Sequence, residues 1–431
     1  MRTRIFGNIF SRSAGSLLLL LFVAMSSEAQ GIGGAGSTTA PEKVRVGIPK
    51  PTPQQVPGSS VLPAGAGSSA ASYPDAESKP APNPDQSSQS AEFVIAPLPF
   101  SNEAFTFGLI PVVQYVFHPD RSDTVSPPSS LVGVGMVATG SSWFAGGGVS
   151  LYLKEDRYRL VGYGGYGSVG YEIFGVGSDD GDEGDAIPIR QGGQLALLEM
   201  LVRTKGKIHI GPRFGYRSIY AKLDSDTTGT PLPPGLNPDD LGSDVSAWAP
   251  GFKILRDTRS DVFYPTSGHE LEFVADFFNA TRRSAVVGDK GVSYQNYQLS
   301  YNHYLPLTST QVLAFRGMVC DVEGSPPFYE LCQFAFSDIR GYQPGRYRDD
   351  TMFAVQSEYR KTLGRYFGFV LFGGVGEVAP AWDSYTWSDL LPAGGTGIRF
   401  NLSKKQRINL RADIAYGANG WSWNLSVGEA F

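Results

Sequence analysis

Hydrophobic and polar residues alternate along most of the chain, which is the pattern of a β-strand with one apolar and one polar face. The clearest example is the segment 407–416. Its polar face carries Arg407, Asn409, Arg411 and Asp413, and its apolar face carries Ile408, Leu410, Ala412, Ile414 and Tyr416. Such a pattern fits either a soluble sandwich or a membrane barrel that contacts lipid outside and encloses a polar lumen.

About sixteen segments of this kind follow one another, an even number as expected for an outer-membrane barrel made of one chain. The predicted strands are 93–100, 105–117, 130–139, 143–153, 158–174, 187–203, 207–223, 244–255, 269–279, 294–305, 311–322, 352–363, 366–378, 393–402, 406–416 and 421–431.

The connections between these segments distinguish the two architectures. Long connections follow the fifth, seventh, ninth, eleventh and thirteenth strands, whereas most of the others are short. There are two exceptions, 119–128 and 257–268. Both are long connections on the side of the sheet where the other connections are short. Short periplasmic turns opposite long extracellular loops are typical of outer-membrane barrels. We therefore predict an all-β fold, a transmembrane antiparallel β-barrel over 93–431.

Backbone groups in lipid must be paired, so we expect the first and last strands to close on each other. The last segment alternates tryptophan with small polar residues. This alternation places Phe431 at the periplasmic rim, in register with the lipid-facing Trp421 and Trp423. The alternative is that the last residue is arbitrary.

The start of the chain has the composition of an export signal followed by a linker. Arg2, Arg4 and Arg12 precede an apolar run that is too short to span a bilayer, and cleavage is expected after Ala29. An uncleaved membrane anchor is the alternative. Residues 30–92 are rich in Gly, Ser, Ala and Pro, which predicts a disordered segment. The sequence therefore divides into a signal peptide 1–29, a linker 30–92 and a barrel 93–431.

The stretch 327–348 lies in a long connection between two predicted strands. It carries several aromatic residues and also Arg340, so it is too apolar to stay fully solvated. Long connections in sheet proteins are usually functional or disordered. We expect this one to fold back onto the polar lumen wall. The alternative is a packed surface loop with a solvated arginine.

Four stretches resemble the BamA/TamA family of outer-membrane proteins, also called the bacterial surface antigen family. Ile339-Arg340-Gly341-Tyr342, preceded by a PFYE run, is similar to the motif of that family's sixth extracellular loop. The others are Asp257-Thr258-Arg259 with the YPTSG run 264–268, Glu358-Tyr359-Arg360, and the C-terminal aromatic Phe431, which is similar to the family's assembly signal. The likeness covers roughly 93–431 and is strongest after Trp248.

The resemblance implies a lumen-facing role for Arg340, with acidic partners on the two following strands. Glu358 corresponds to the first acid, whereas Gly374 stands where the family pattern has aspartate. No periplasmic POTRA domain is recognisable before the barrel. The implied function is a non-enzymatic outer-membrane barrel of the bacterial cell that assists protein or lipid assembly or translocation. Its partners would be outer-membrane lipid and client outer-membrane or periplasmic proteins. The alternative is a porin-like or structural barrel without assembly activity.

Cys320 and Cys332 flank the start of this loop, and an exported protein can keep a disulfide between them. Two buried free thiols are the alternative.

Other chemistry is weakly indicated. The histidines include His303, close to Ser300, but no G-x-S-x-G elbow exists, so we expect no enzyme.

The acidic run 179–185 could attract a divalent cation, yet it lacks EF-hand spacing and is better interpreted as a solvated loop. We therefore expect no cofactor and no metal. The net charge of −5 gives no reason to expect a nucleic-acid partner.

Overall fold

The computed structural model describes residues 91–100, 108–178, 187–223, 232–236, 241, 243–261, 263–284, 288–334, 337–342, 345–403 and 408–431. The predicted signal peptide, almost all of the predicted linker and the acidic run 179–185 lie outside these residues.

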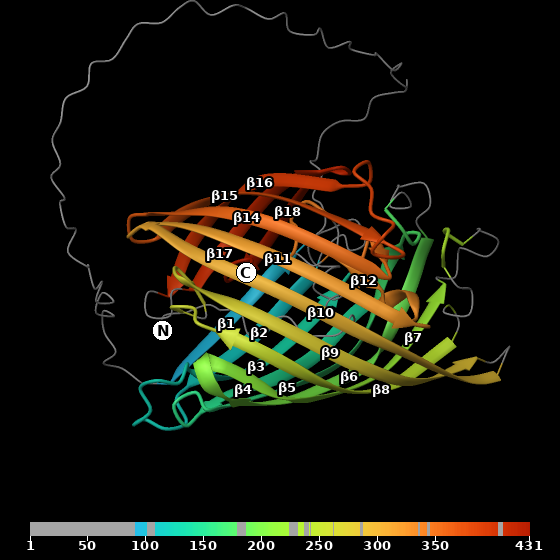
Figure 1. Cartoon of the computed structure of the whole chain (residues 1–431), viewed down its shortest axis with the longest axis horizontal. Helices are drawn as coiled ribbons and strands as arrows, with labels where there is room; N and C mark the ends of the chain where they lie inside the picture. Colours follow the sequence, from blue (N-terminus) through green and yellow to red (C-terminus); the bar gives the residue numbers. More distant parts are fainter. Residues whose placement is uncertain are drawn as a thin grey trace, which may run out of the picture. The chain divides into compact units, whose positions relative to one another are not determined.

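The described chain forms one large antiparallel sheet in which each strand pairs with its neighbour in sequence. Its strands are β1 (Glu92–Phe100), β2 (Gly108–Phe117), β3 (Ser129–Ala138), β4 (Ser142–Leu153), β5 (Tyr158–Ile173), β6 (Ile187–Arg203), β7 (Ile208–Leu223), β8 (Ser243–Asp257), β9 (Gly268–Ser284), β10 (Gly288–Thr308), β11 (Gln311–Gly324), β14 (Thr351–Leu363), β15 (Phe367–Ala379), β16 (Leu391–Ser403), β17 (Ile408–Gly417) and β18 (Gly420–Val427). The strands are tilted and curl around an interior as a barrel (Figure 1). These sixteen strands confirm the predicted all-β architecture.

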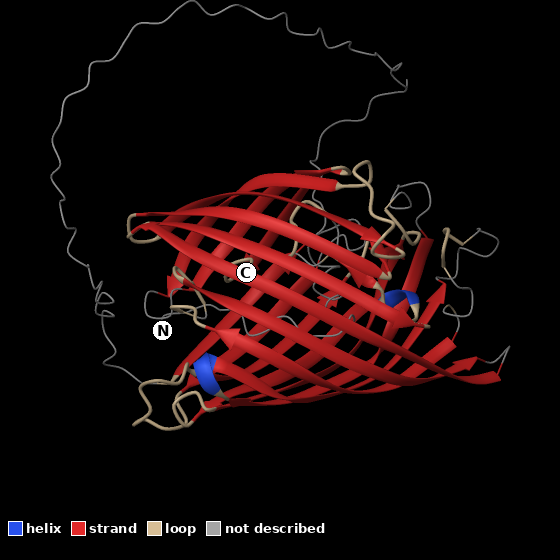
Figure 2. Cartoon of the chain, viewed as in Figure 1, coloured by secondary structure: helices blue, strands red, loops and turns tan. Residues whose placement is uncertain are grey.

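Four further elements are short. Two 3-10 helices, η3 (Lys205–Lys207) and η5 (Phe328–Glu330), lie among the described residues, which otherwise form strands and loops (Figure 2). Strands β12 (Cys332–Gln333) and β13 (Arg348–Asp349) pair with each other between β11 and β14. No helix among the described residues has the length and apolar character needed to cross a membrane.

The predicted strand boundaries differ most from the structure at two places. A long loop was expected between the ninth and tenth strands, but only 285–287 separate β9 from β10. These strands extend further than predicted because 279–284 pair in register with 288–293. At the C-terminus, β18 ends at Val427, although the alternation predicts a strand that continues to the last residue.

The expected ladder between the first and last strands is not found in the described residues, where β1 and β18 each pair with one neighbour. Strand β1 contains Pro97 and Pro99, and proline has no N–H to donate to a ladder. Strand β18 ends early and is eight residues long.

The two faces of the sheet have opposite character. On β17, Arg411 and Asp413 are buried inside, whereas Ile414 and Tyr416 are about half exposed outside. On β9, Glu272 is buried and Leu271 is exposed. A water-soluble protein keeps apolar side chains inside and leaves charged ones outside. These two strands reverse that arrangement, as the alternation of the sequence predicts.

Candidate functional site

The described residues of the connection between β11 and β14, which are 325–334, 337–342 and 345–350, are mostly buried in the interior of the barrel. Its buried apolar side chains include Phe328, Tyr329, Phe334, Ile339, Tyr342 and Tyr347. They form one cluster with inward-facing residues of β5 to β8, among them Ile173, Ile219 and Ala247. We call residues 325–350 the lumen loop. It packs inside the barrel and is not a surface loop with a solvated arginine.

Two covalent or charged contacts hold the start of the lumen loop. Cys320 of β11 and Cys332 of β12 form a disulfide, so the pairing expected from their positions is present and the free thiols are not. Glu330 of η5 forms an ion pair with Arg217 of β7, which lies on a distant strand of the sheet. The disulfide fixes the loop to its own strand, and the ion pair fixes it to the facing wall.

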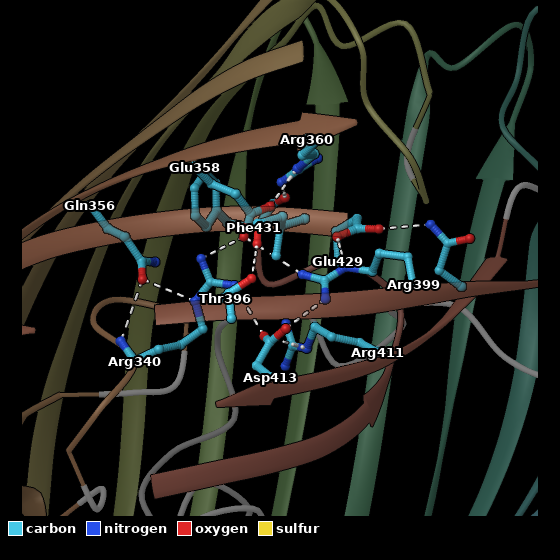
Figure 3. A network of polar contacts seen from close by, with 12 residues as sticks. Arg340, Gln356, Glu358, Arg360, Thr396, Arg399, Arg411, Asp413, Glu429 and Phe431 are labelled. Carbon is cyan, nitrogen blue, oxygen red and sulfur yellow. Dashed lines mark hydrogen bonds and ion pairs between the residues drawn. The ribbon is translucent and has the colours of Figure 1, made fainter. Parts of the chain in front are cut away.

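Arg340 lies at the centre of a polar network in which side chains from several strands point toward one another (Figure 3). Its Nη2 atom lies 2.5 Å from Oε2 of Glu358, and its Nη1 atom lies 3.0 Å from Oδ2 of Asp413. Its Nε atom donates to Oε1 of Gln356 at 3.0 Å. The guanidinium also lies over the ring of Phe372, 3.5 Å from the centroid. The structure therefore brings together Arg340 and Glu358, as the resemblance implies.

The neighbours of Arg340 in the sequence fix its position. Ile339 packs in the apolar cluster. Gly341 has φ +117°, and a Cβ there would lie 2.8 Å from that of Ala393, so glycine is needed for both conformation and space. The Tyr342 hydroxyl donates to the Pro392 carbonyl at 2.6 Å. Burial raises the pKa of Tyr342 to about 12.

The second acidic partner comes from a strand other than the one that the resemblance implies. Asp413 lies on β17, three strands beyond β14 in the sheet, and not on β15. On β15, a Cβ at Gly374 would lie 2.6 Å from the Val355 carbonyl oxygen and 3.2 Å from the Cα of Gln356. An aspartate does not fit at Gly374 without a shift of β14. The alternation of 407–416 placed Asp413 on the polar face, but nothing in the sequence paired it with Arg340.

The network extends beyond these contacts to further arginines. Arg360 Nε lies 2.6 Å from Oε1 of Glu358. Arg399 Nη1 lies 2.5 Å from Oδ1 of Asp413, and Arg399 Nε lies 2.8 Å from Oε2 of Glu429. Arg411 Nε lies 3.4 Å from Oδ2 of Asp413. The guanidinium groups are those of Arg340, Arg360, Arg399 and Arg411, and the carboxylates are those of Glu358, Asp413 and Glu429. Each of these charged groups lies beside a group of opposite charge inside the barrel.

Phe431 lies inside the barrel and not at the lipid-facing rim, which corrects the expected position. The last four residues leave the sheet after β18, and Phe431 is 2% exposed. Its carbonyl oxygen accepts a hydrogen bond from Arg360 Nη2 at 2.8 Å. The expected register failed because Gly428, with φ +88°, turns the chain out of the strand direction. The contact between Glu429 and Arg399 could not be predicted from the sequence for the same reason, since a strand that continued to the last residue would not place the two side chains together.

The connection between β8 and β9, residues 258–267, is also built around an arginine. Arg259 donates to both oxygens of Asp257, at 3.0 Å each, and its Nη2 atom lies 2.7 Å from Oε1 of Glu270. From the same connection, the Pro265 carbonyl oxygen lies 3.5 Å from Arg360 Nη1. The connection, Glu358 and the chain terminus therefore meet at Arg360.

The serine and histidine considered for catalysis lie on opposite faces of β10. Ser300 is buried on the inner face. His303 faces outward, with its Nδ1 atom 3.3 Å from the Tyr301 hydroxyl. The strand separates the two side chains, so they do not form a nucleophile and base pair.

No protein-family model matches the sequence. No curated protein sequence matches it either. Among solved structures, the chain is similar to BamA from Haemophilus ducreyi lacking POTRA domains 1–3, at 13% identity and TM-score 0.48, with 79% of this chain and 70% of that chain covered. It is similar to CdiB from Acinetobacter baumannii at 13% identity and TM-score 0.46, with 79% of this chain and 60% of that chain covered. These likenesses are distant, and the proposals below rest on this chain's own contacts.

Proposed function

We propose that this chain is a non-enzymatic outer-membrane β-barrel that assists the assembly or translocation of outer-membrane proteins or lipid, with its lumen loop held inside. The observation that carries the proposal is the loop itself, fixed by Arg340 to Glu358 and Asp413. The BamA/TamA-like motifs in the sequence point to the same class of protein. Lipid would contact the outer face, and client proteins would be the partners.

Membrane insertion is supported by the outward side chains. Large apolar residues that are 37% to 62% exposed recur on most strands of the sheet, including Leu198, Trp248, Leu271, Leu299, Leu371, Ile398 and Ile414. Water would have to cover this apolar surface in a soluble protein, whereas lipid covers it without cost. Strands cross a bilayer in barrels because their backbone groups pair with one another.

Assembly or translocation is favoured over free diffusion because the described lumen is occupied. The lumen loop packs against β5 to β8 on one side. Its arginine joins β14 and β17 on the other. A general porin keeps a polar, water-filled channel. Here a long internal loop fills the channel. Small solutes therefore have no open path through the described part of the lumen, and we infer that client proteins or lipids are handled at the barrel wall.

Two experiments test the proposed function. In planar bilayers, the purified protein is expected to remain mostly closed with brief openings, whereas a large steady conductance would favour the porin-like alternative. In cells, depletion of the protein is expected to lower the amounts of particular outer-membrane proteins or lipids. An unchanged outer-membrane proteome and lipid composition would overturn the assembly role.

A further inference from the structure

Arg348 is a buried cation of the lumen loop that takes no part in the network around Arg340. It is 1% exposed and lies on β13, directly opposite Gln333 of β12. Its Nε atom donates to the Gly345 carbonyl oxygen at 3.0 Å, and its guanidinium lies 5.4 Å from the centre of the Phe328 ring. Among the described residues, no carboxylate forms an ion pair with Arg348, and its Nη1 atom has no hydrogen-bond partner.

Other buried cations in the interior lie beside carboxylates. Arg316 Nη2 lies 2.5 Å from Oδ1 of Asp338, and Lys253 Nζ lies 3.0 Å from Oε2 of Glu272. Burial of a charge is costly unless an opposite charge compensates it. An arginine does not avoid this cost by losing its proton, because its guanidinium stays charged in proteins. Arg348 therefore needs an anion to compensate its charge.

Two further hydrogen-bond donors near Arg348 are buried and unpaired. Gln333 is 8% exposed, and its side chain shares a face with that of Arg348 because the two residues are cross-strand partners. Tyr171 of β5 interacts electrostatically with Arg348, and its hydroxyl donates to Oε1 of Gln191 on β6. In the described part of the chain, both polar atoms of Gln333 and Nε2 of Gln191 have no partner. The unpaired donors of the loop and of the wall therefore lie in one neighbourhood.

The chemistry of this neighbourhood is that of an anion site. Buried polar groups in folded proteins are almost always hydrogen-bonded. A water molecule would satisfy the two amides but would not compensate the guanidinium. A negative ion does both, because it accepts hydrogen bonds from N–H groups and those from a charged donor are the stronger kind. Since all three side chains are buried, the ligand has to be small.

We propose that Arg348, together with Gln191 and Gln333, binds a small inorganic anion of the size of chloride. The anion bridges the lumen loop to the barrel wall, because Arg348 and Gln333 belong to the loop and Gln191 belongs to β6. It holds the end of the loop in the way that the disulfide holds its start. This inference does not depend on the proposed function.

Unfolding in urea at constant ionic strength tests the site with full-length protein folded in detergent. The probe is sodium chloride, and sodium gluconate is the reference because its anion is much larger. A ligand that binds only the folded state lowers the unfolding equilibrium constant about tenfold at ten times its dissociation constant. We expect this constant to fall in the wild type as chloride replaces gluconate. Equal constants in the two salts would overturn the anion site.

Arg348→Gln separates an anion ligand from an arginine with a structural role. This variant should lose the response to chloride. In gluconate, its urea midpoint should be no lower than that of the wild type, because the substitution removes an uncompensated buried charge. A midpoint lowered by the same amount in both salts would identify a structural arginine and overturn the proposal.

Arg316→Gln is the matched control, because Arg316 is also buried but has Asp338 as its partner. Its midpoint should fall in both salts, and its response to chloride should remain. Loss of the response in this variant would attribute it to general destabilisation and contradict a site at Arg348. A chloride response that appears only after the acids of 179–185 are replaced by amides would assign Arg348 to the chain's own carboxylates, which also contradicts the proposal.

A second measurement covers the case in which Arg348→Gln does not fold. Crystals of the wild-type protein grown in sodium bromide use an anion that resembles chloride and scatters X-rays anomalously. We expect an anomalous peak within hydrogen-bond distance of Nη1 of Arg348. Peaks confined to the exposed surface would be an adventitious ion only, and the site would be wrong.

Discussion

At the scale of single residues, the site depends on compensated charge. Arg340 contacts two carboxylates and an aromatic ring in the interior. A buried ion pair contributes little by comparison with apolar packing, but removal of one partner leaves an uncompensated charge, which is costly. Single substitutions in this network should therefore be more damaging than its net stabilisation suggests.

Arg340→Ala should destabilise the folded barrel by about 3 kcal/mol, because Glu358 and Asp413 lose a shared cation. Arg340→Lys should fall between this variant and the wild type, since an ammonium keeps the charge but lacks the fork of a guanidinium. The midpoint of unfolding in urea, followed by the heat-modifiable gel shift, measures both. Equal midpoints for the alanine variant and the wild type would show that the contacts are not important for stability.

Gly374→Asp should lower the yield of folded protein, even though it introduces the acid of the family pattern. Its Cβ would meet the Val355 carbonyl at 2.6 Å. The matched control is Gly373→Ala on the same strand, where the nearest atom to a Cβ is 3.7 Å away, so folding should be retained. A Gly374→Asp variant that folds as well as Gly373→Ala would contradict the steric reason given for the use of Asp413.

At the scale of elements, the lumen loop and the turns are held by few but specific contacts. The disulfide joins β11 to β12, so the loop starts at a fixed distance from its strand. At the short-turn end, the connection 118–128 is fixed by Asp123, which accepts from the backbone N–H of Glu155 at 2.7 Å. These contacts restrict the motion of the two connections.

Replacement of Cys320 and Cys332 by alanine should loosen the lumen loop while the barrel stays folded. Closing a loop of this size contributes about 3 kcal/mol in the chain-entropy model. Brief openings in planar bilayers should become more frequent, and reduction of the wild type should reproduce the effect. If the double variant and the reduced protein conduct like the oxidised wild type, the disulfide does not hold the loop closed.

Asp123 gives the connection 118–128 a defined pH dependence. Burial alone would raise the pKa of Asp123, but hydrogen bonds from Ser126, Glu155 and Val125 lower it well below its ordinary value. A lowered folded pKa means that the contribution to stability is complete above the unfolded pKa and is lost as pH falls through the folded pKa.

Hydrogen exchange at the Glu155 amide should therefore be protected equally, after correction for intrinsic rates, between pH 5 and 8. Asp123→Asn should lose this protection at pH 7. Protection that varies across pH 5 to 8 in the wild type would contradict the hydrogen-bonded carboxylate.

At the scale of the whole molecule, alternation determined which parts of the fold were predictable. The sixteen strands and the faces of their side chains follow from the alternation of apolar and polar residues, because the two faces of each strand contact different environments. The inward positions of Gln356, Glu358 and Arg360 follow from the same parity. The use of Asp413 and the inward turn of residues 428–431 did not follow, because contacts across the lumen and a positive φ at Gly428 leave no periodic trace in the sequence.

The central claim is that the outer face of the sheet is covered by lipid. Nitroxide labels at Leu371→Cys and Ile414→Cys, both outward on their strands, test it in reconstituted bilayers, with Trp387→Cys in the loop after β15 as the exposed control. We predict that oxygen relaxes the labels at 371 and 414 more than a water-soluble nickel chelate does, with the reverse at 387. Labels at 371 and 414 that respond to the chelate as strongly as the label at 387 would contradict a membrane-spanning barrel.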